Sequence, residues 1–389
     1  MARHRRWLLL CWLLLCAPIA AKAREAPLQA RQADIAGAPG TLISSRPIAG
    51  GPKDSRAYRI LYRSIGLEGE AIAVSGMAVV PRGEAPAGGR PVVAWAHPTS
   101  GLVERCAPSL AGRRFEFIAG LKDMVGRGFV VVATDYPGLG TAGPHPYLVG
   151  ASEGRAVLDS VRAVRLLPGA GAGARFAVWG HSQGGHAALF AGLMAPSYAP
   201  EFRLVGVAAA APATDLATLF DDDLRSPAGR NIAAMTLWSW ARVFDAPIEK
   251  VLDPAAAPTV DRLARLCIES VFDILARRNL ARPLAQHFLA DSGVAQEPPW
   301  KALLAANTPG PLPADVPVFL SQGGADHIVR PEVTAAYMKG LCAVGEPVRM
   351  VVVPDAAHGP IAQKTAPAAV AWISDRFAGQ PAPSDCPAP

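Results

Sequence analysis

A serine in a glycine-rich turn is the residue of this 389-residue chain best suited to covalent chemistry. Ser182 is the centre of Gly180-His-Ser-Gln-Gly184, which fits the pattern G-x-S-x-G. In this motif the serine occupies a strained turn between a strand and a helix, and the glycines let neighbouring backbone pass without a Cβ clash. The apolar run 176–179 and the helical composition of 185–194 supply that strand and helix. We predict that Ser182 is a nucleophile.

A serine hydroxyl needs a base to take its proton and a carboxylate to orient that base. His358 follows the last predicted strand, and Asp326 follows the strand before it. The chain order of serine, acid and histidine is the order that accompanies G-x-S-x-G. We therefore expect Asp326 to orient His358, and His358 to activate Ser182. The alternatives are Asp135, Asp315 and Asp355 for the acid, and His97, His145, His181, His186 and His327 for the base.

Charge that develops on a carbonyl oxygen in the transition state requires hydrogen-bond donors. The backbone N–H of Gln183, directly after the nucleophile, is the expected first donor. The second should come from the loop His97-Pro-Thr-Ser-Gly101. Pro98 has no N–H, which leaves Thr99 or Ser100, and we favour the backbone and hydroxyl of Thr99. No pair of histidines and acids has metal-ligand spacing, so we predict a site without metal or cofactor.

The elements that position these residues alternate between buried strands and helices. Apolar strands are predicted at 91–96, 128–134, 176–179, 204–211, 316–322 and 348–353, and helices at 115–125, 152–167, 331–341 and 361–377. Strands that are apolar on both faces indicate a mostly parallel α/β sheet with helices on both sides. Two segments rich in β-branched and aromatic residues, 58–64 and 71–80, predict an antiparallel pair at the sheet edge.

The alternation of strands and helices is interrupted between 214 and 312. Helical patterns at 231–244 and 259–276, without an obvious buried strand, predict a helical cap inserted into the sheet domain. We divide the chain into a signal peptide (1–23), an extended lead-in (24–50), two core segments (51–213 and 313–378), the cap (214–312) and a Pro-rich tail (379–389).

Aromatic residues of this cap are candidate contacts for an apolar substrate. Trp238, Trp240 and Trp300 look exposed in the sequence pattern. We expect Trp238, Trp240 and Phe244 to accept the apolar chain of a substrate. Ordinary packing between the cap and the core would explain each of these residues equally well.

The N-terminus has the order of a cleavable export signal. Basic residues precede the apolar run 7–16 and the small-residue site Ala21-Lys-Ala23. An anchor would need about 20 apolar residues, so we expect cleavage after Ala23 and no transmembrane anchor. Removal of 1–23 deletes four basic residues and no acidic one, which lowers the formal net charge from +6 to +2. This small charge implies no nucleic-acid partner.

Four cysteines remain beyond residue 23: Cys106, Cys267, Cys342 and Cys386. An even number in an exported chain suggests two disulfides. The sequence alone allows three pairings, and buried free thiols are the alternative.

Taken together, these motifs resemble the secretory lipase family of α/β-hydrolases, the fungal lipase A type and its bacterial relatives. The resemblance spans most of 55–378 and rests on 180–186, 97–101, Cys106-Ala-Pro-Ser109, Asp135-Tyr-Pro-Gly-Leu-Gly-Thr141 and the Asp326/His358 pair. It implies an α/β-hydrolase fold with a helical cap over the acyl-binding site. It also implies an exported lipase or carboxylesterase with a Ser-Asp-His triad, an ester or lipid substrate, and a lipid interface as a candidate partner.

The same resemblance implies the disulfide pairs Cys106–Cys267 and Cys342–Cys386. Family members often have glycine at the position of Pro98. Two other functions use the same residues: a serine peptidase or acyltransferase, because amides also form acyl-enzymes, and a binding protein with an inactive site. The sequence makes no prediction of the oligomeric state.

Overall fold

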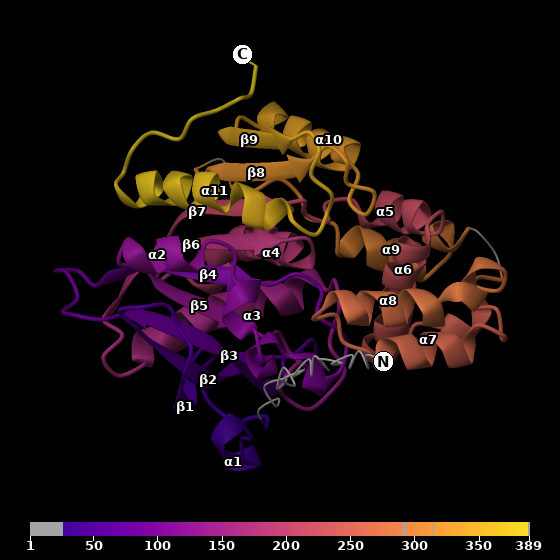
Figure 1. Ribbon diagram of the computed structural model, residues 1–389, viewed down its shortest axis with the longest axis horizontal. Helices are drawn as coiled ribbons and strands as arrows, with labels where there is room; N and C mark the ends of the chain where they lie inside the picture. The colour runs from indigo at the N-terminus through magenta and orange to yellow at the C-terminus, as the bar shows by residue number, and fades with distance from the viewer. Residues whose placement is uncertain (1–25, 291–292, 314, 388–389) are drawn as a thin grey trace, which may run out of the picture.

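The computed structural model describes residues 26–290, 293–313 and 315–387, so the predicted signal peptide lies outside the described residues. Within them, nine strands form one open sheet in the order β1-β2-β3-β5-β4-β6-β7-β8-β9 (Figure 1). The strands are β1 (Leu42–Ile48), β2 (Ser55–Ile65), β3 (Ala71–Pro81), β4 (Arg90–Ala96), β5 (Val130–Thr134), β6 (Ala172–His181), β7 (Arg203–Ala210), β8 (Val318–Gly323) and β9 (Val348–Val353).

The sheet is antiparallel at one edge and parallel elsewhere. Strands β1, β2, β3 and β5 pair antiparallel, whereas all pairs from β5 to β9 are parallel. This confirms the mostly parallel α/β sheet and the antiparallel edge. Strand β1 was not predicted, because most of its residues are exposed and it has no apolar alternation.

Helices cover both faces of the sheet. They are α2 (Leu121–Gly126), α3 (Gly150–Leu166), α4 (Gln183–Tyr198), α10 (Pro331–Ala343) and α11 (Ile361–Phe377), whereas the short helix α1 (Gln32–Ile35), which precedes β1, buries no residue. Along β4, Val93 and Trp95 enter one apolar core while Val92 and Ala94 enter the other. This two-sided burial is the physical reason for the continuous apolar strands in the sequence.

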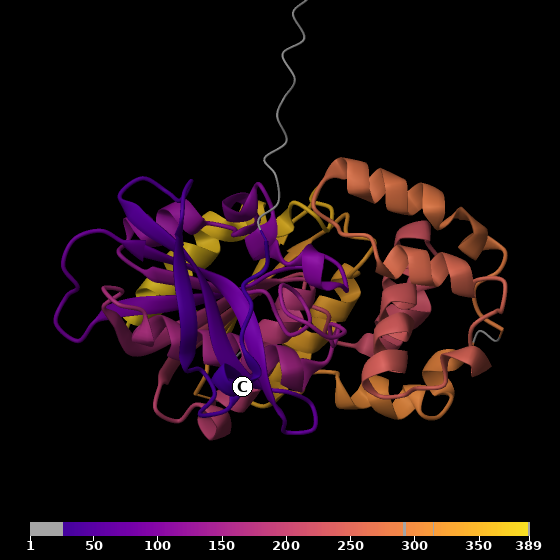
Figure 2. The same ribbon diagram turned by 90° about the horizontal axis from the view of Figure 1, so that it is seen from below.

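The α-helices described between β7 and β8, five in all, form a lobe beside the sheet (Figures 1 and 2). They are α5 (Leu216–Asp223), α6 (Pro227–Val243), α7 (Ala257–Ala264), α8 (Val271–Leu280) and α9 (Trp300–Ala306). The continuous helix predicted at 259–276 is wrong, because the chain leaves the helical path between α7 and α8. There Cys267 is bonded to Cys106, and the Ile268 N–H donates to the Ser100 carbonyl at 2.8 Å.

The tryptophans of this lobe are buried, so the expectation that they are exposed is wrong. Trp238 is 6% exposed, Trp240 0% and Trp300 2%. The Trp240 and Trp300 rings stack with centroids 6.5 Å apart, and Trp240 Nε1 donates to the Tyr147 carbonyl at 2.8 Å. These side chains belong to the same apolar core as Val93 and Trp95 of β4, so they pack the lobe against the sheet domain.

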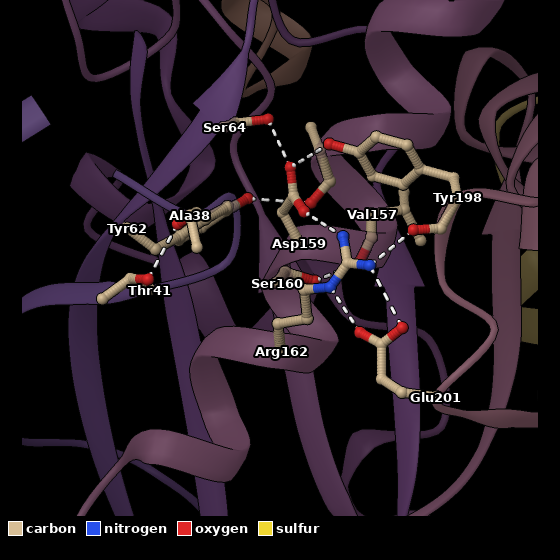
Figure 3. A network of polar contacts seen from close by, with 11 residues as sticks. Ala38, Thr41, Tyr62, Ser64, Val157, Asp159, Ser160, Arg162, Tyr198 and Glu201 are labelled. Atoms are coloured by element: carbon tan, nitrogen blue, oxygen red, sulfur yellow. Dashed lines mark hydrogen bonds and ion pairs between the residues drawn. The ribbon is translucent and has the colours of Figure 1, made fainter. Parts of the chain in front are cut away.

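A buried carboxylate ties α3 to the sheet and to the end of α4 (Figure 3). Asp159 on α3 accepts hydrogen bonds from Ser64 Oγ at 2.6 Å and the Tyr198 hydroxyl at 2.9 Å. Its other oxygen pairs with Arg162 at 2.8 Å, and Arg162 also pairs with Glu201 at 2.6 Å. These bonds link β2, α3 and the C-terminal end of α4 through one buried carboxylate.

Two disulfides close the structure at distant points. Cys106–Cys267 joins the region after β4 to the α7–α8 connection, and Cys342–Cys386 joins α10 to the C-terminal tail. This is the pairing that the resemblance implies. The tail is also fixed by Asp385, whose carboxylate accepts from the Met350 N–H at 2.7 Å. Among the described helices, none is long and apolar enough to cross a membrane.

Candidate active site

Ser182 lies in the turn between β6 and α4, with φ of 58° and ψ of −120°. A positive φ is costly for a residue with a side chain, so the surrounding backbone must hold it. A Cβ on Gly180 would lie 2.0 Å from the Gly184 carbonyl oxygen, and one on Gly184 would lie 2.0 Å from the Ala96 carbonyl oxygen. The two glycines of the motif are therefore required by close backbone contact.

Two hydrogen bonds connect Ser182 to a histidine and a carboxylate. His358 Nε2 lies 2.8 Å from Ser182 Oγ, and His358 Nδ1 lies 2.8 Å from Asp326 Oδ2. His358 follows β9 and Asp326 follows β8, so neighbouring parallel strands deliver both to one sheet edge. This arrangement can move a proton from the serine hydroxyl to the imidazole while the carboxylate stabilises the charged ring.

The Asp326 carboxylate is held ionised by its surroundings. Burial alone would raise the pKa of Asp326, but the hydrogen bond and charge of His358 lower it below the ordinary value. The N–H groups of Ile328 and Val329 act in the same direction, because they donate to Oδ1 at 2.9 and 3.0 Å. The base is therefore oriented by a fixed, charged acceptor.

The two expected oxyanion donors lie at the same edge. Gln183 is the first residue of α4, where helix N–H groups have no acceptor inside the helix. The loop that follows β4, residues 97–101 (the β4 loop), starts next to the motif, because Ala96 at the end of β4 lies against Gly184. In this loop, the Thr99 hydroxyl lies 2.9 Å from the Tyr147 hydroxyl, and Ser100 Oγ is buried without a partner.

A small apolar pocket adjoins Ser182. Its cavity volume is about 40 Å³, and its walls come from the core and from α5, α6 and α9. The lining residues are Tyr147, Leu148, Ser182, Gln183, Ala213, Leu216, Leu219, Phe220, Ile232, Thr236, Leu304, Ile328 and Val329. Trp238, Trp240 and Phe244 are not among them; α6 contributes Ile232 and Thr236 instead.

A fully buried polar cluster lies behind the nucleophile. Glu153 on α3 accepts from Gln183 Nε2 at 2.7 Å and from the Leu148 N–H at 3.0 Å, and its other oxygen contacts His186 Nδ1 at 2.8 Å. Gln183 Nε2 also lies 2.8 Å from His145 Nε2. Burial lowers the pKa of His145 to about 3, so its ring is neutral and accepts this bond. Glu153 thereby fixes the side chain of an expected oxyanion donor.

Sequence reasoning did not identify Glu153 as part of the site. It lies 29 positions before the nucleophile in a helix with an ordinary amphipathic pattern, and its partners come from α4 and from the loop before α3. The only signal available was the number of histidines close to the motif, His181 and His186 among them.

The other candidate acids and bases are engaged elsewhere or exposed. Asp135 is buried and accepts from Ser75 and Ser109 at 2.6 Å each; burial raises its pKa. His181 Nε2 donates to the His358 carbonyl at 3.0 Å, and burial lowers its pKa to about 3. Both ring nitrogens of His97 lie against backbone carbonyl oxygens. The remaining candidates, Asp315, Asp355 and His327, are exposed.

Comparison with known proteins assigns the family. Residues 117–385 match the family model described as secretory lipase. The chain belongs to the secretory lipase family. It is therefore a hydrolase of the lipase type, with an ester or a lipid as its substrate. Within the described part of the chain, no three His, Cys, Asp or Glu side chains are grouped so that they could hold a metal ion.

Relatives of this member of the secretory lipase family occur in fungi and bacteria. Lipase A of Moesziomyces aphidis is 24% identical over 82% of this chain and 72% of its own length. A protein of Mycobacterium tuberculosis named a probable inactive lipase is 26% identical over 88% of this chain and 79% of its own. The crystal structure of a rice cell wall degrading esterase, LipA of Xanthomonas oryzae, has a TM-score of 0.72 at 22% identity, covering 88% and 99% of the two chains.

Proposed function

We propose that this protein is an exported serine hydrolase that cleaves carboxylic esters through an acyl-enzyme. The observation that carries the proposal is the pair of hydrogen bonds that connects Ser182 to His358 and His358 to Asp326, with Ser182 lining an apolar pocket. The two disulfides and the family support export, because disulfides persist in oxidising compartments.

In the first half-reaction, Ser182 Oγ attacks the ester carbonyl carbon while His358 Nε2 takes the hydroxyl proton. The carbonyl oxygen becomes an oxyanion, which accepts hydrogen bonds from the Gln183 N–H and from Thr99. His358 then gives its proton to the departing alkoxide, and an alcohol leaves. In the second half-reaction, water attacks the acyl-enzyme with the same base, and Ser182 regains its proton as the carboxylic acid departs.

The apolar pocket would hold the acyl chain of the substrate. A cavity of about 40 Å³ has room for a few water-sized groups, which is less than an extended acyl chain needs. Leu219 and Phe220 of α5 and Ile232 of α6 form much of its wall. We therefore expect α5 and α6 to move apart when a longer acyl chain binds.

Hydrolysis of p-nitrophenyl butyrate by the Ser182→Ala variant tests the proposal. We expect kcat to fall by about 10⁴-fold or more, because the nucleophile is lost. Ser197→Ala is the matched control, since Ser197 is an exposed serine further along the same helix. Wild-type turnover by Ser182→Ala would refute the mechanism.

A fluorophosphonate probe separates an active site from an inactive one. The relative named a probable inactive lipase makes this test necessary. We expect the probe to label Ser182 in the folded protein and to leave the Ser182→Ala variant unlabelled. Failure to label the folded wild type would favour the binding-protein alternative, and turnover of peptidyl anilides without ester hydrolysis would favour a peptidase.

A further inference from the structure

Helix α8 exposes its apolar side chains and buries a charged one. Val271 is 69% exposed, Phe272 82%, Ile274 54% and Leu275 48%. Its buried residue is Arg277. Elsewhere in the described chain, the exposed large apolar side chains are isolated on three separate elements: Leu166, Val344 and Val352. The apolar patch, Val271, Phe272, Ile274 and Leu275, is therefore a local concentration and not the scatter found on any protein surface.

The inner side of α8 is fixed by specific bonds, so the patch cannot turn inward. Arg277 Nη1 donates to the carbonyl oxygens of Leu263 at 2.8 Å and Leu266 at 2.6 Å, at the end of α7. The Ser270 side chain caps α8 by accepting from the Asp273 N–H at 3.2 Å. Rotating α8 to bury the patch would remove the acceptors of a guanidinium and is therefore unfavourable.

Positive charge continues the apolar stripe. Val271, Leu275 and Arg278 are spaced by four and three residues, so they lie next to one another on one face of the helix. Arg282 lies just beyond the end of α8, and both arginines are exposed. Neither forms an ion pair with any residue that the structure describes. In Figure 2, α8 runs along the outer edge of the helical lobe.

We propose that α8 is an adsorption surface for lipid interfaces that carry anionic headgroups. The apolar patch would enter the boundary between headgroups and acyl chains, and Arg278 and Arg282 would contact headgroup phosphates. A second copy of this chain is the alternative occupant, and it would show itself as a dimer that depends on the apolar patch. This binding is independent of the proposed hydrolysis.

Adsorption through α8 has a geometric consequence for the site. The residues directly before α8, Cys267 and Ile268, are bonded to Cys106 and to the Ser100 carbonyl. The lipid surface would therefore lie on the side of the molecule where the lobe is joined to the β4 loop, the loop that contains Thr99.

Vesicle co-sedimentation tests the proposal in a catalytically inactive background. The protein begins at Arg24, so that the apolar run 7–16 cannot account for binding, and carries Ser182→Ala, so that no lipid is hydrolysed. The vesicles are phosphatidylcholine alone or phosphatidylcholine mixed with phosphatidylglycerol. We expect binding to the mixed vesicles, reduced at least roughly tenfold by Phe272→Ser/Leu275→Ser and also by Arg278→Gln/Arg282→Gln.

A matched variant controls for loss of exposed apolar surface in general. Leu166→Ser/Val352→Ser removes two side chains that are each 55% exposed and lie away from α8, and it should bind as the parent does. With Ser182 restored, the α8 variants should hydrolyse a soluble ester at the wild-type rate, which separates this proposal from the catalytic one. Any of four results would overturn it: no vesicle binding, equal loss in the control, equal binding to both vesicle types, or a dimer that dissociates in the Phe272→Ser/Leu275→Ser variant.

Discussion

Replacing Gly184 by alanine tests whether the close approach of helix α4 to the β4 loop sets the catalytic geometry. The added Cβ would lie 2.0 Å from the Ala96 carbonyl oxygen and 2.7 Å from that of His97. Cβ atoms in proteins remain at least 3.0 Å from such atoms, and both of these belong to backbone that cannot rotate away. The helix and the loop must therefore separate.

The size of the effect follows from that separation. Moving from 2.0 to 3.0 Å displaces the Gln183 N–H relative to Thr99 by about 1 Å, and misplacement of this size costs about 100-fold in rate. We expect Gly184→Ala to lower kcat for p-nitrophenyl butyrate by about 100-fold. Circular dichroism and Tm would establish that the variant is folded.

Gly340→Ala is the matched control for this variant. Gly340 lies in α10, has no positive φ, and has nothing within 4 Å of the position that a Cβ would occupy. The variant should keep the wild-type kcat and gain about 0.4 to 1 kcal/mol in stability, because alanine restricts the unfolded chain. If Gly184→Ala kept kcat within about threefold of wild type with an unchanged Tm, the inferred need for close contact would be wrong.

Three further predictions concern the cluster, acid stability and the tail. Glu153→Gln replaces a carboxylate that accepts three hydrogen bonds by an amide with one acceptor atom, so we expect a loss of about 1 to 3 kcal/mol in unfolding free energy and a lower kcat, measured by denaturation and by ester turnover. His145 and His181 have folded-state pKa values of about 3, below the unfolded value, so the unfolded chain binds protons first as the pH falls. The free energy of unfolding should therefore drop by about 4 kcal/mol between pH 7.5 and pH 5. A Tm that stays constant over that range would contradict this prediction. Cys342→Ser/Cys386→Ser opens a disulfide of sequence separation 44 and should cost about 4 kcal/mol in stability while kcat is unchanged; a fall in kcat would show that the tail supports the site.

The convergence of Ser182, Asp326 and His358 could be predicted because local patterns determine it. The G-x-S-x-G turn depends on adjacent residues, and the acid and the histidine each follow an apolar strand that the sequence displays. Parallel strands end at the same edge, so identifying the strands also placed the residues that follow them.

Features that depend on contacts between distant segments could not be predicted. Trp240 is buried because Trp300, 60 positions away, stacks on it. The helix break near Cys267 arises from a bond to Cys106, and the sequence pattern continues across it as if no break were present. Helix α8 has ordinary composition, and its inverted orientation depends on where the end of α7 lies.

The bridge between Cys106 and Cys267 also bears on when this protein can act. It closes beside Gly101, where an added Cβ would lie 2.6 Å from Cys106 Sγ, and it holds the loop that contains Thr99 against the helical lobe. A chain whose cysteines are still reduced lacks this covalent tie. For the hydrolase proposed above, oxidation of these two cysteines would therefore precede full activity, and a chain that is still in a reducing compartment would be the less active form.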